Sequence, residues 1–251
     1  MQPKNNNPVM TLEKVCKRFG GVVAADEVSF TLQSGQIRGL IGPNGSGKST
    51  TLNLISGICD VDPGQIFLDG ANITNDPIHH RARLGIARTF QHPRLLSRCD
   101  IRTNLFLGLD LGNRKKRSGT ANEIEQSVDQ LLEVAGLKIN LDDSITTLSY
   151  GQQKLLEIVR AILTKPKVVL LDEPAAGINS REMERIKALI DIAVKNNAAI
   201  LLVEHSMDLV MSLCDIITVL NFGRVIAEGV PTEIQGNDSV IEAYLGKRRH
   251  A

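Results

Sequence analysis

The stretch Gly42-Pro43-Asn44-Gly45-Ser46-Gly47-Lys48-Ser49 decides how this 251-residue chain folds. It matches the pattern G-x-x-x-x-G-K-[ST] in full, and it lies between an apolar strand predicted at residues 37–41 and a helix that begins around Leu52. In that setting the glycines let successive backbone N–H groups turn towards a phosphate, and the helix N-terminus adds a favourable dipole. The stretch therefore predicts a loop that binds nucleotide phosphates; the alternative is an ordinary glycine turn before a helix.

The polar side chains of this loop have separate expected tasks. Lys48 is expected to reach the β and γ phosphates of ATP, and Ser49 offers a hydroxyl to Mg²⁺. The metal is needed because the charges of the nucleotide cannot be packed together without neutralisation. The predicted cofactors are ATP and Mg²⁺, and the predicted contacts from this segment are Gly42, Pro43, Asn44, Gly45, Ser46, Gly47, Lys48, Ser49 and Thr50.

A second apolar strand, predicted at residues 168–171, ends in the two carboxylates Asp172 and Glu173. Ligands bind at the carboxyl edge of a parallel sheet, so this position favours a functional interpretation over a plain solvated turn. The pattern resembles a Walker B strand. Asp172 is expected to hold a water on Mg²⁺, and Glu173 to orient and polarise the water that attacks the phosphate.

A third motif precedes a strongly apolar helix. Ser149 and Gln152 form the S-x-x-Q pattern of a capping box, in which each side chain bonds to the backbone N–H of the other residue. A capped helix N-terminus next to a glycine is also an anion site. The motif therefore predicts a helix start and a second phosphate contact.

The segment Leu148-Ser149-Tyr150-Gly151-Gln152 resembles the signature motif of ATP-binding cassette (ABC) proteins, usually Leu-Ser-Gly-Gly-Gln. The order of motifs over residues 10–245 is also similar to that family. By this resemblance Gln91 is the Q-loop glutamine, His205 is the switch histidine, and Asn179 falls at the D-loop. Phe19 lies where the family places an aromatic ring against adenine, although it could equally belong to the core.

Two positions depart from the common family pattern. Tyr150 replaces the first signature glycine, and Asn179 replaces a D-loop aspartate. Both departures resemble the branch that serves branched-chain amino acid importers. The segment Gly85-Ile86-Ala87-Arg88-Thr89-Phe90-Gln91 and the ending Ile241-Glu242-Ala243-Tyr244-Leu245-Gly246 resemble the same branch.

The resemblance implies a mechanism that needs two ATPase subunits. Two copies, or two similar cassettes, would face head to tail, with each ATP between Lys48 of one and Ser149, Tyr150, Gly151 and Gln152 of the other. Glu173 would act on water, His205 would hold the γ phosphate, and Gln91 would sense Mg²⁺. The implied partners are integral membrane permease subunits and, indirectly, an extracytoplasmic solute-binding protein.

The implied fold is an α/β P-loop NTPase cassette with a mixed parallel core sheet, an antiparallel N-terminal β part and a helical subdomain. Alternating strands and turns before residue 34 indicate the antiparallel part. Residues 1–251 are expected to form one nucleotide-binding domain, with a helical insertion at about 76–160 that carries the signature motif. Helix 181–194 and strands 168–171 and 200–203 predict a parallel sheet covered by helices.

Composition limits the other possibilities. The 29 Lys and Arg residues nearly balance 28 Asp and Glu residues, so no global field favours nucleic acid. No stretch approaches the roughly 18 apolar residues of a spanning helix, and residues 1–9 do not resemble a signal peptide. The composition therefore predicts a protein that is soluble, or peripheral to a membrane at most, and the family resemblance implies a peripheral subunit on the cytoplasmic face of the plasma membrane.

Several alternatives stay open from sequence. The chain could instead serve a urea or amide importer, work as a soluble ABC ATPase, or be a regulatory nucleotide-binding module. His79, His80 and His92 are interpreted as surface residues, and Glu204 as a structural or coupling residue. The basic tail at residues 247–249 is interpreted as a solvated end, with contact to acidic headgroups as the alternative.

Overall fold

The computed structural model describes residues 8–111 and 121–245. The basic loop predicted at residues 114–117 and the basic tail at 247–249 lie outside this described part. Helices and strands alternate along most of the chain, and the strands form two sheets of four and six strands. The helices are α1 (Lys48–Ser56), α2 (Ile78–Leu84), α3 (Ile101–Leu111), α5 (Ala121–Val134), α6 (Tyr150–Leu163), α7 (Ser180–Lys195), α8 (Met207–Leu213), α9 (Pro231–Gln235) and α10 (Asp238–Leu245).

The larger sheet positions the site. Its order is β10-β9-β3-β8-β7-β6, and its pairs are parallel except β9 with β10. Its strands are β3 (Ile37–Ile41), β6 (Ile86–Arg88), β7 (Val168–Asp172), β8 (Ala199–Val203), β9 (Ile216–Asn221) and β10 (Arg224–Gly229). Leu40 of β3 and Asp172 of β7 both pair with Val203 of β8, so these strands end at one edge.

The smaller sheet is antiparallel, as predicted for the N-terminal part. Its order is β2-β1-β4-β5, and its strands are β1 (Met10–Phe19), β2 (Val22–Leu32), β4 (Gln65–Leu68) and β5 (Ala71–Asn72). Val28, Phe30 and Leu32 are buried and alternate with more exposed neighbours, which is the period of a strand with one face on the core.

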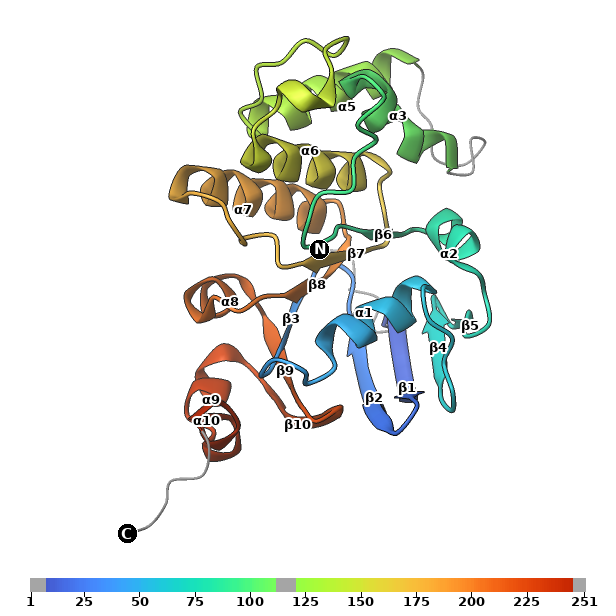
Figure 1. Cartoon of the computed structure of the whole chain (residues 1–251), viewed down its shortest axis with the longest axis vertical. Helices are drawn as coiled ribbons and strands as arrows, with labels where there is room; N and C mark the ends of the chain where they lie inside the picture. Colours follow the sequence, from blue (N-terminus) through green and yellow to red (C-terminus); the bar gives the residue numbers. More distant parts are fainter. Residues whose placement is uncertain (1–7, 112–120, 246–251) are drawn as a thin grey trace, which may run out of the picture.

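Alternate residues of the central strands face two different cores. Val169 and Leu171 of β7 pack with α3, α5, α6 and α7, whereas Val168 and Leu170 pack with α1 and the smaller sheet. Figure 1 shows the same layers, with α6 and α7 on one side of the larger sheet and α1 on the other. Because both faces are covered, β8 is apolar throughout and β7 is apolar as far as Leu171, instead of alternating.

The helical insertion is shorter than the expected range of about 76–160. Its helices α3, α5 and α6 begin only at Ile101. The segment before them contains β6, which pairs with β7 at the edge of the larger sheet, and α2, which contacts α1. The three-residue strand β6 is too short to give a periodic signal, so the sequence pattern did not separate it from the helical region.

Candidate active site

The phosphate loop joins β3 to α1, as predicted. Gly47 precedes α1 with φ of 105°, and Gly42 has φ of 151°. A Cβ atom on Gly42 would lie 2.1 Å from the carbonyl oxygen of Leu220, and one on Gly47 would lie 2.3 Å from that of Ala24. Both positions therefore require glycine, because strands β9 and β2 pack directly against the loop backbone.

Lys48 is buried at the centre of this loop. Its ammonium donates to the carbonyl oxygens of Gly42 at 2.8 Å and Pro43 at 3.0 Å. Burial lowers the pKa of Lys48, and the nearby charges of Glu173 and Asp172 oppose that shift. The hydroxyl of Ser46 is also buried and has no hydrogen-bond partner within the described residues. It is therefore available to donate or accept a hydrogen bond with a bound ligand.

Glu173 lies directly after β7, where it meets the predicted glutamine and histidine. The amide Nε2 of Gln91 donates to Glu173 Oε2 at 2.8 Å, and His205 Nε2 lies 2.8 Å from Glu173 Oε1. These three residues come from separate segments, after β6, β7 and β8. The structure thus brings together the residues that the resemblance assigns to water activation.

The main chain at Glu173 is unusual. Its φ is +47°, in the left-handed region that non-glycine residues rarely adopt. Its N–H donates to the Val203 carbonyl at 2.9 Å, and its carbonyl accepts from Ala176 N at 3.2 Å and Lys154 Nζ at 2.5 Å. Backbone strain of this kind persists only where surrounding contacts determine the conformation.

Asp172 pairs with a residue whose role the sequence reasoning did not identify. Its Oδ2 lies 3.1 Å from the Arg88 guanidinium, which also donates to Asn53 and Ser56 on α1. Burial lowers the pKa of Arg88, and the hydrogen bond and charge of Asp172 oppose the shift. The only sequence signal for Arg88 is a basic residue in the apolar surroundings of a short strand.

The predicted capping box of α6 is confirmed. Ser149 Oγ accepts from Gln152 N at 3.3 Å, and Gln152 Oε1 accepts from Ser149 N at 2.9 Å. Tyr150 extends from the same turn, and its hydroxyl donates to the Gln91 carbonyl at 3.1 Å. Asn179 caps α7 in the same way, with Glu182 as its partner.

The signature segment and the phosphate loop of one chain do not form a single site. Within the described part of the chain, no hydrogen bond joins residues 149–152 to residues 42–49. Helices α1 and α6 belong to the two different cores, on opposite faces of the larger sheet (Figure 1). Within the described residues, the N-terminus of α6 is thus not bonded to the phosphate loop of its own chain.

The remaining predicted residues lie at the surface or at the site edge. Phe19 ends β1 with 48% of its area exposed, which argues against a core role, and the Lys17 ammonium lies 5.7 Å from its ring centre. His79, His80 and His92 are exposed. Glu204 is buried and accepts from Ala175 N and His205 N, so it joins the turn after β7 to the end of β8. Burial raises the pKa of Glu204 against these hydrogen bonds.

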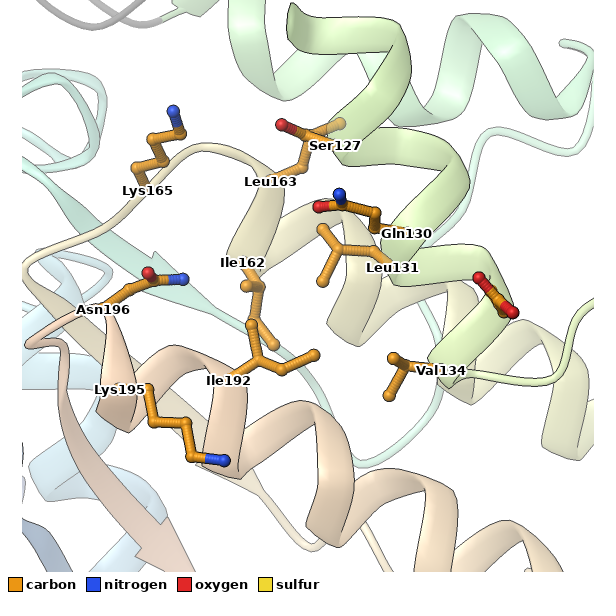
Figure 2. Close-up of a pocket in the computed structure, with 11 residues that line it drawn as sticks. Ser127, Gln130, Leu131, Val134, Ile162, Leu163, Lys165, Ile192, Lys195 and Asn196 are labelled. Atoms are coloured by element: carbon orange, nitrogen blue, oxygen red, sulfur yellow. The ribbon is translucent and has the colours of Figure 1, made fainter.

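A cavity of about 500 Å³ lies away from these residues, between α5, α6 and α7. Figure 2 shows Leu131, Val134, Ile162 and Ile192 around it, while the amines of Lys165 and Lys195 point away from its aliphatic centre. None of the predicted nucleotide-site residues lines it.

This fold and site define a P-loop ATPase of the ABC cassette class. A family model described as "ABC transporter" matches residues 25–176, and one described as "Branched-chain amino acid ATP-binding cassette transporter" matches residues 224–250. The chain belongs to the ABC transporter family as an ATP-binding, ATP-hydrolysing subunit. Membership implies membrane permease partners. Among the helices of the described residues, none has the length and apolar character needed to cross a membrane.

Individual relatives span nearly the whole chain. The high-affinity branched-chain amino acid transport ATP-binding protein BraF of Pseudomonas aeruginosa is 38% identical, covering 96% of this chain and 99% of its own. The corresponding protein LivG of Escherichia coli K12 is 36% identical over the same shares. A crystal structure of an ATP-binding cassette of an ABC transporter, in its ADP conformation, matches with a TM-score of 0.83 and 31% identity, covering 96% of this chain and 100% of the other.

Proposed function

We propose that this chain is the motor subunit of an importer for branched-chain amino acids and that Glu173 is its catalytic carboxylate. The solute assignment is supported by the names of the relatives that match over nearly the whole chain, and by the match at residues 224–250. A urea or amide importer is the alternative, because a motor subunit does not enclose the solute. We also propose that residues 1–251 work as one nucleotide-binding domain.

The observation that carries the catalytic proposal is the pair of contacts on Glu173. Its carboxylate is held by Gln91 and His205 at the sheet edge where the phosphate loop also begins. With ATP phosphates in residues 42–49, the Glu173 carboxylate would accept a hydrogen bond from the attacking water. The water oxygen would bond to the γ phosphorus as the bond between the γ phosphorus and the β-phosphate oxygen breaks. The proton of the water would pass to the Glu173 carboxylate and on to solvent, and ADP and phosphate would leave. His205 would donate to the γ phosphate during this step.

The residues present suit a magnesium ion that binds together with the nucleotide. Ser49, Asp172 and the side-chain amide oxygen of Gln91 would hold it, and oxygen donors are what Mg²⁺ prefers. Within the described residues, no group of three or more His, Cys, Asp or Glu side chains could hold a metal alone. One carboxylate beside a phosphate loop fits an ion that takes its other ligands from phosphates and water. When bound, Mg²⁺ supplies positive charge against the phosphates.

A second ATPase subunit would complete the site. Because the capped N-terminus of α6 lies apart from its own phosphate loop, Ser149, Tyr150 and Gly151 would contact ATP held by Lys48 of another subunit. Phe19 would stack on the adenine, since its ring is half exposed at the end of β1. The second subunit is either another copy or a similar cassette, and the pair would bind permease subunits at the cytoplasmic face of the plasma membrane.

Two substitutions test this function on the purified chain. Glu173→Gln is expected to retain Mg·ATP binding and to lose at least about 100-fold in turnover, because the water loses its acceptor. It should also accumulate as an ATP-dependent dimer in gel filtration. Lys48→Ala is expected to lose ATP binding itself, because the phosphates lose their main cationic partner.

Lys187→Ala is the matched control, because Lys187 lies on α7 and pairs only with exposed Glu184 among the described residues. A Glu173→Gln protein that stays monomeric and hydrolyses ATP at the wild-type rate would refute the catalytic assignment. The solute is tested separately by deleting the gene and measuring uptake of labelled leucine and urea. Unchanged leucine uptake with reduced urea uptake would favour the alternative importer.

A further inference from the structure

Helix α6 carries a row of four polar side chains on one face, which we call the α6 row: Tyr150, Lys154, Glu157 and Arg160. Their spacing of four, three and three residues places them along the same side of the helix. All four bond to main-chain atoms of other segments. Burying polar side chains in a mostly apolar helix costs free energy of desolvation, which their hydrogen bonds to these main-chain atoms offset.

Three members of the α6 row hold the segment around Gln91. The Tyr150 hydroxyl donates to the Gln91 carbonyl at 3.1 Å. The Glu157 carboxylate accepts from Arg94 N at 2.8 Å and Phe90 N at 3.3 Å. The Arg160 guanidinium donates to the Arg94 carbonyl at 2.9 Å. The backbone on both sides of Gln91 is therefore held by one helix.

Lys154, the remaining member of the α6 row, contacts Glu173 instead of the segment around Gln91. Lys154 is 2% exposed, and its ammonium donates to the carbonyl of Glu173 at 2.5 Å. The carboxylates of Glu204, Glu157, Glu173 and Asp172 all act electrostatically on it. The bond holds the peptide group of a residue whose φ of +47° needs support from its surroundings.

We propose that Lys154 is a positioning residue for hydrolysis, which holds the main chain of Glu173 so that its carboxylate stays aligned with Gln91. The proposal rests on the catalytic role proposed above for Glu173. Because α6 holds the backbone of both residues, it sets the 2.8 Å contact between the Gln91 amide and the Glu173 carboxylate. Small displacements of a catalytic group have large effects on rate, of about 100-fold for 1 Å.

The test compares Lys154→Met, which keeps the length of the side chain but removes its donors, with Lys154→Arg, which keeps a cationic donor. Lys154→Met is expected to lower kcat for ATP hydrolysis about 10- to 100-fold. Its KM for ATP and its affinity for a fluorescent ATP analogue should change less than about threefold. Lys154→Arg should recover most of kcat, and the control Lys187→Met, at a partly exposed position of α7, should match wild type.

A second comparison shows whether the effect passes through Glu173. In a Glu173→Gln background, Lys154→Met should change the residual turnover less than about twofold, because the aligned carboxylate is already absent. If Lys154→Met fails to fold, the charge-balanced double variant Lys154→Met with Glu204→Gln is compared with Glu204→Gln alone by the same measures.

Three results would overturn the inference: a kcat within twofold of wild type in Lys154→Met, a parallel rise in KM, or an equal loss in the Glu173→Gln background. The failure of the proposed function looks different. In that case wild-type turnover would not depend on Glu173 at all, and both proposals would be rejected.

Discussion

Lys48 shows how a single residue obtains its place from atoms close in sequence. Its ammonium bonds to two carbonyl oxygens of its own loop, five and six residues earlier. The motif therefore predicts most of its surroundings. Glu173 differs, because its main chain and carboxylate depend on Lys154, Gln91, Val203 and His205. A strand followed by two acids indicates the position of Glu173 and says nothing of these partners.

The cysteines provide a prediction at the scale of the residue. All four are free, and burial raises the pKa of Cys214 to about 12. The thiolate is the nucleophile, so Cys214 should not react with iodoacetamide in the native protein at pH 8. Cys59 and Cys99 are only partly buried and should react first, as peptide mass spectrometry would show. Modification of Cys214 at the rate of Cys99, without unfolding, would contradict this expectation.

The two capped helices show how elements depend on one another. The N-termini of α6 and α7 each carry a complete capping box, and they meet at Gly151. A Cβ atom on Gly151 would lie 2.0 Å from the Glu182 carboxylate, which belongs to the capping box of α7. The second glycine of the signature motif is therefore favoured by its packing against Glu182, apart from any contact with phosphate.

Gly151→Ala is expected to destabilise the chain by about 1 kcal/mol, because the new methyl group displaces Glu182 and breaks the α7 capping box. In a Glu182→Ala background the same substitution should be neutral or stabilising by a few tenths of a kcal/mol, since alanine favours a helix over glycine. Urea unfolding of the four proteins measures the difference. An equal cost in both backgrounds would show that Glu182 is not the reason for glycine here.

At the scale of the whole molecule, the larger sheet lies between helix α1, which follows the phosphate loop, and helix α6, which follows the signature motif. The phosphate loop and Glu173 follow its carboxyl edge, while α6 lies on one face. The capped N-terminus of α6 reaches Gln91 through Tyr150, and within the described residues it has no hydrogen bond to the phosphate loop. One chain thus contains the phosphate loop and the capped N-terminus of α6, the two halves of the proposed nucleotide site, without a hydrogen bond between them in the described residues. The arrangement explains why a second subunit is needed for the proposed mechanism.

A mixing experiment tests the composite site. Two defects are made in the Glu173→Gln background: Lys48→Ala, which removes phosphate binding, and Ser149→Glu, which puts negative charge at the α6 N-terminus. The charge suits the helix dipole but repels a phosphate. Neither protein alone should dimerise with ATP, whereas the mixture should form heterodimers that contain one intact site.

Gel filtration with and without ATP measures this outcome, and unmodified Glu173→Gln is the positive control. If each protein remains monomeric in the mixture, the signature segment does not complete the partner's site. If Ser149→Glu dimerises alone as well as the control, the capped N-terminus of α6 does not face the phosphates.

The amino-acid sequence alone predicted the loop at residues 42–49, the strands β3, β7 and β8, helix α7 and the capping box of α6. These features depend on neighbours in sequence, because hydrophobic period, glycine conformation and capping act over a few residues. The comparisons confirmed the family and fold class that the motifs indicated.

Only the tertiary structure decided what lies beside those motifs. It placed β6 in the larger sheet, paired Arg88 with Asp172, 84 residues away, and brought Lys154 to the Glu173 carbonyl. Strand order and long-range pairing depend on how the layers pack, and the local hydrophobic periodicity of the sequence does not predict them. The surroundings of Glu173, the proposed catalytic carboxylate, therefore come from the assembled sheet and from the helix α6 packed against it.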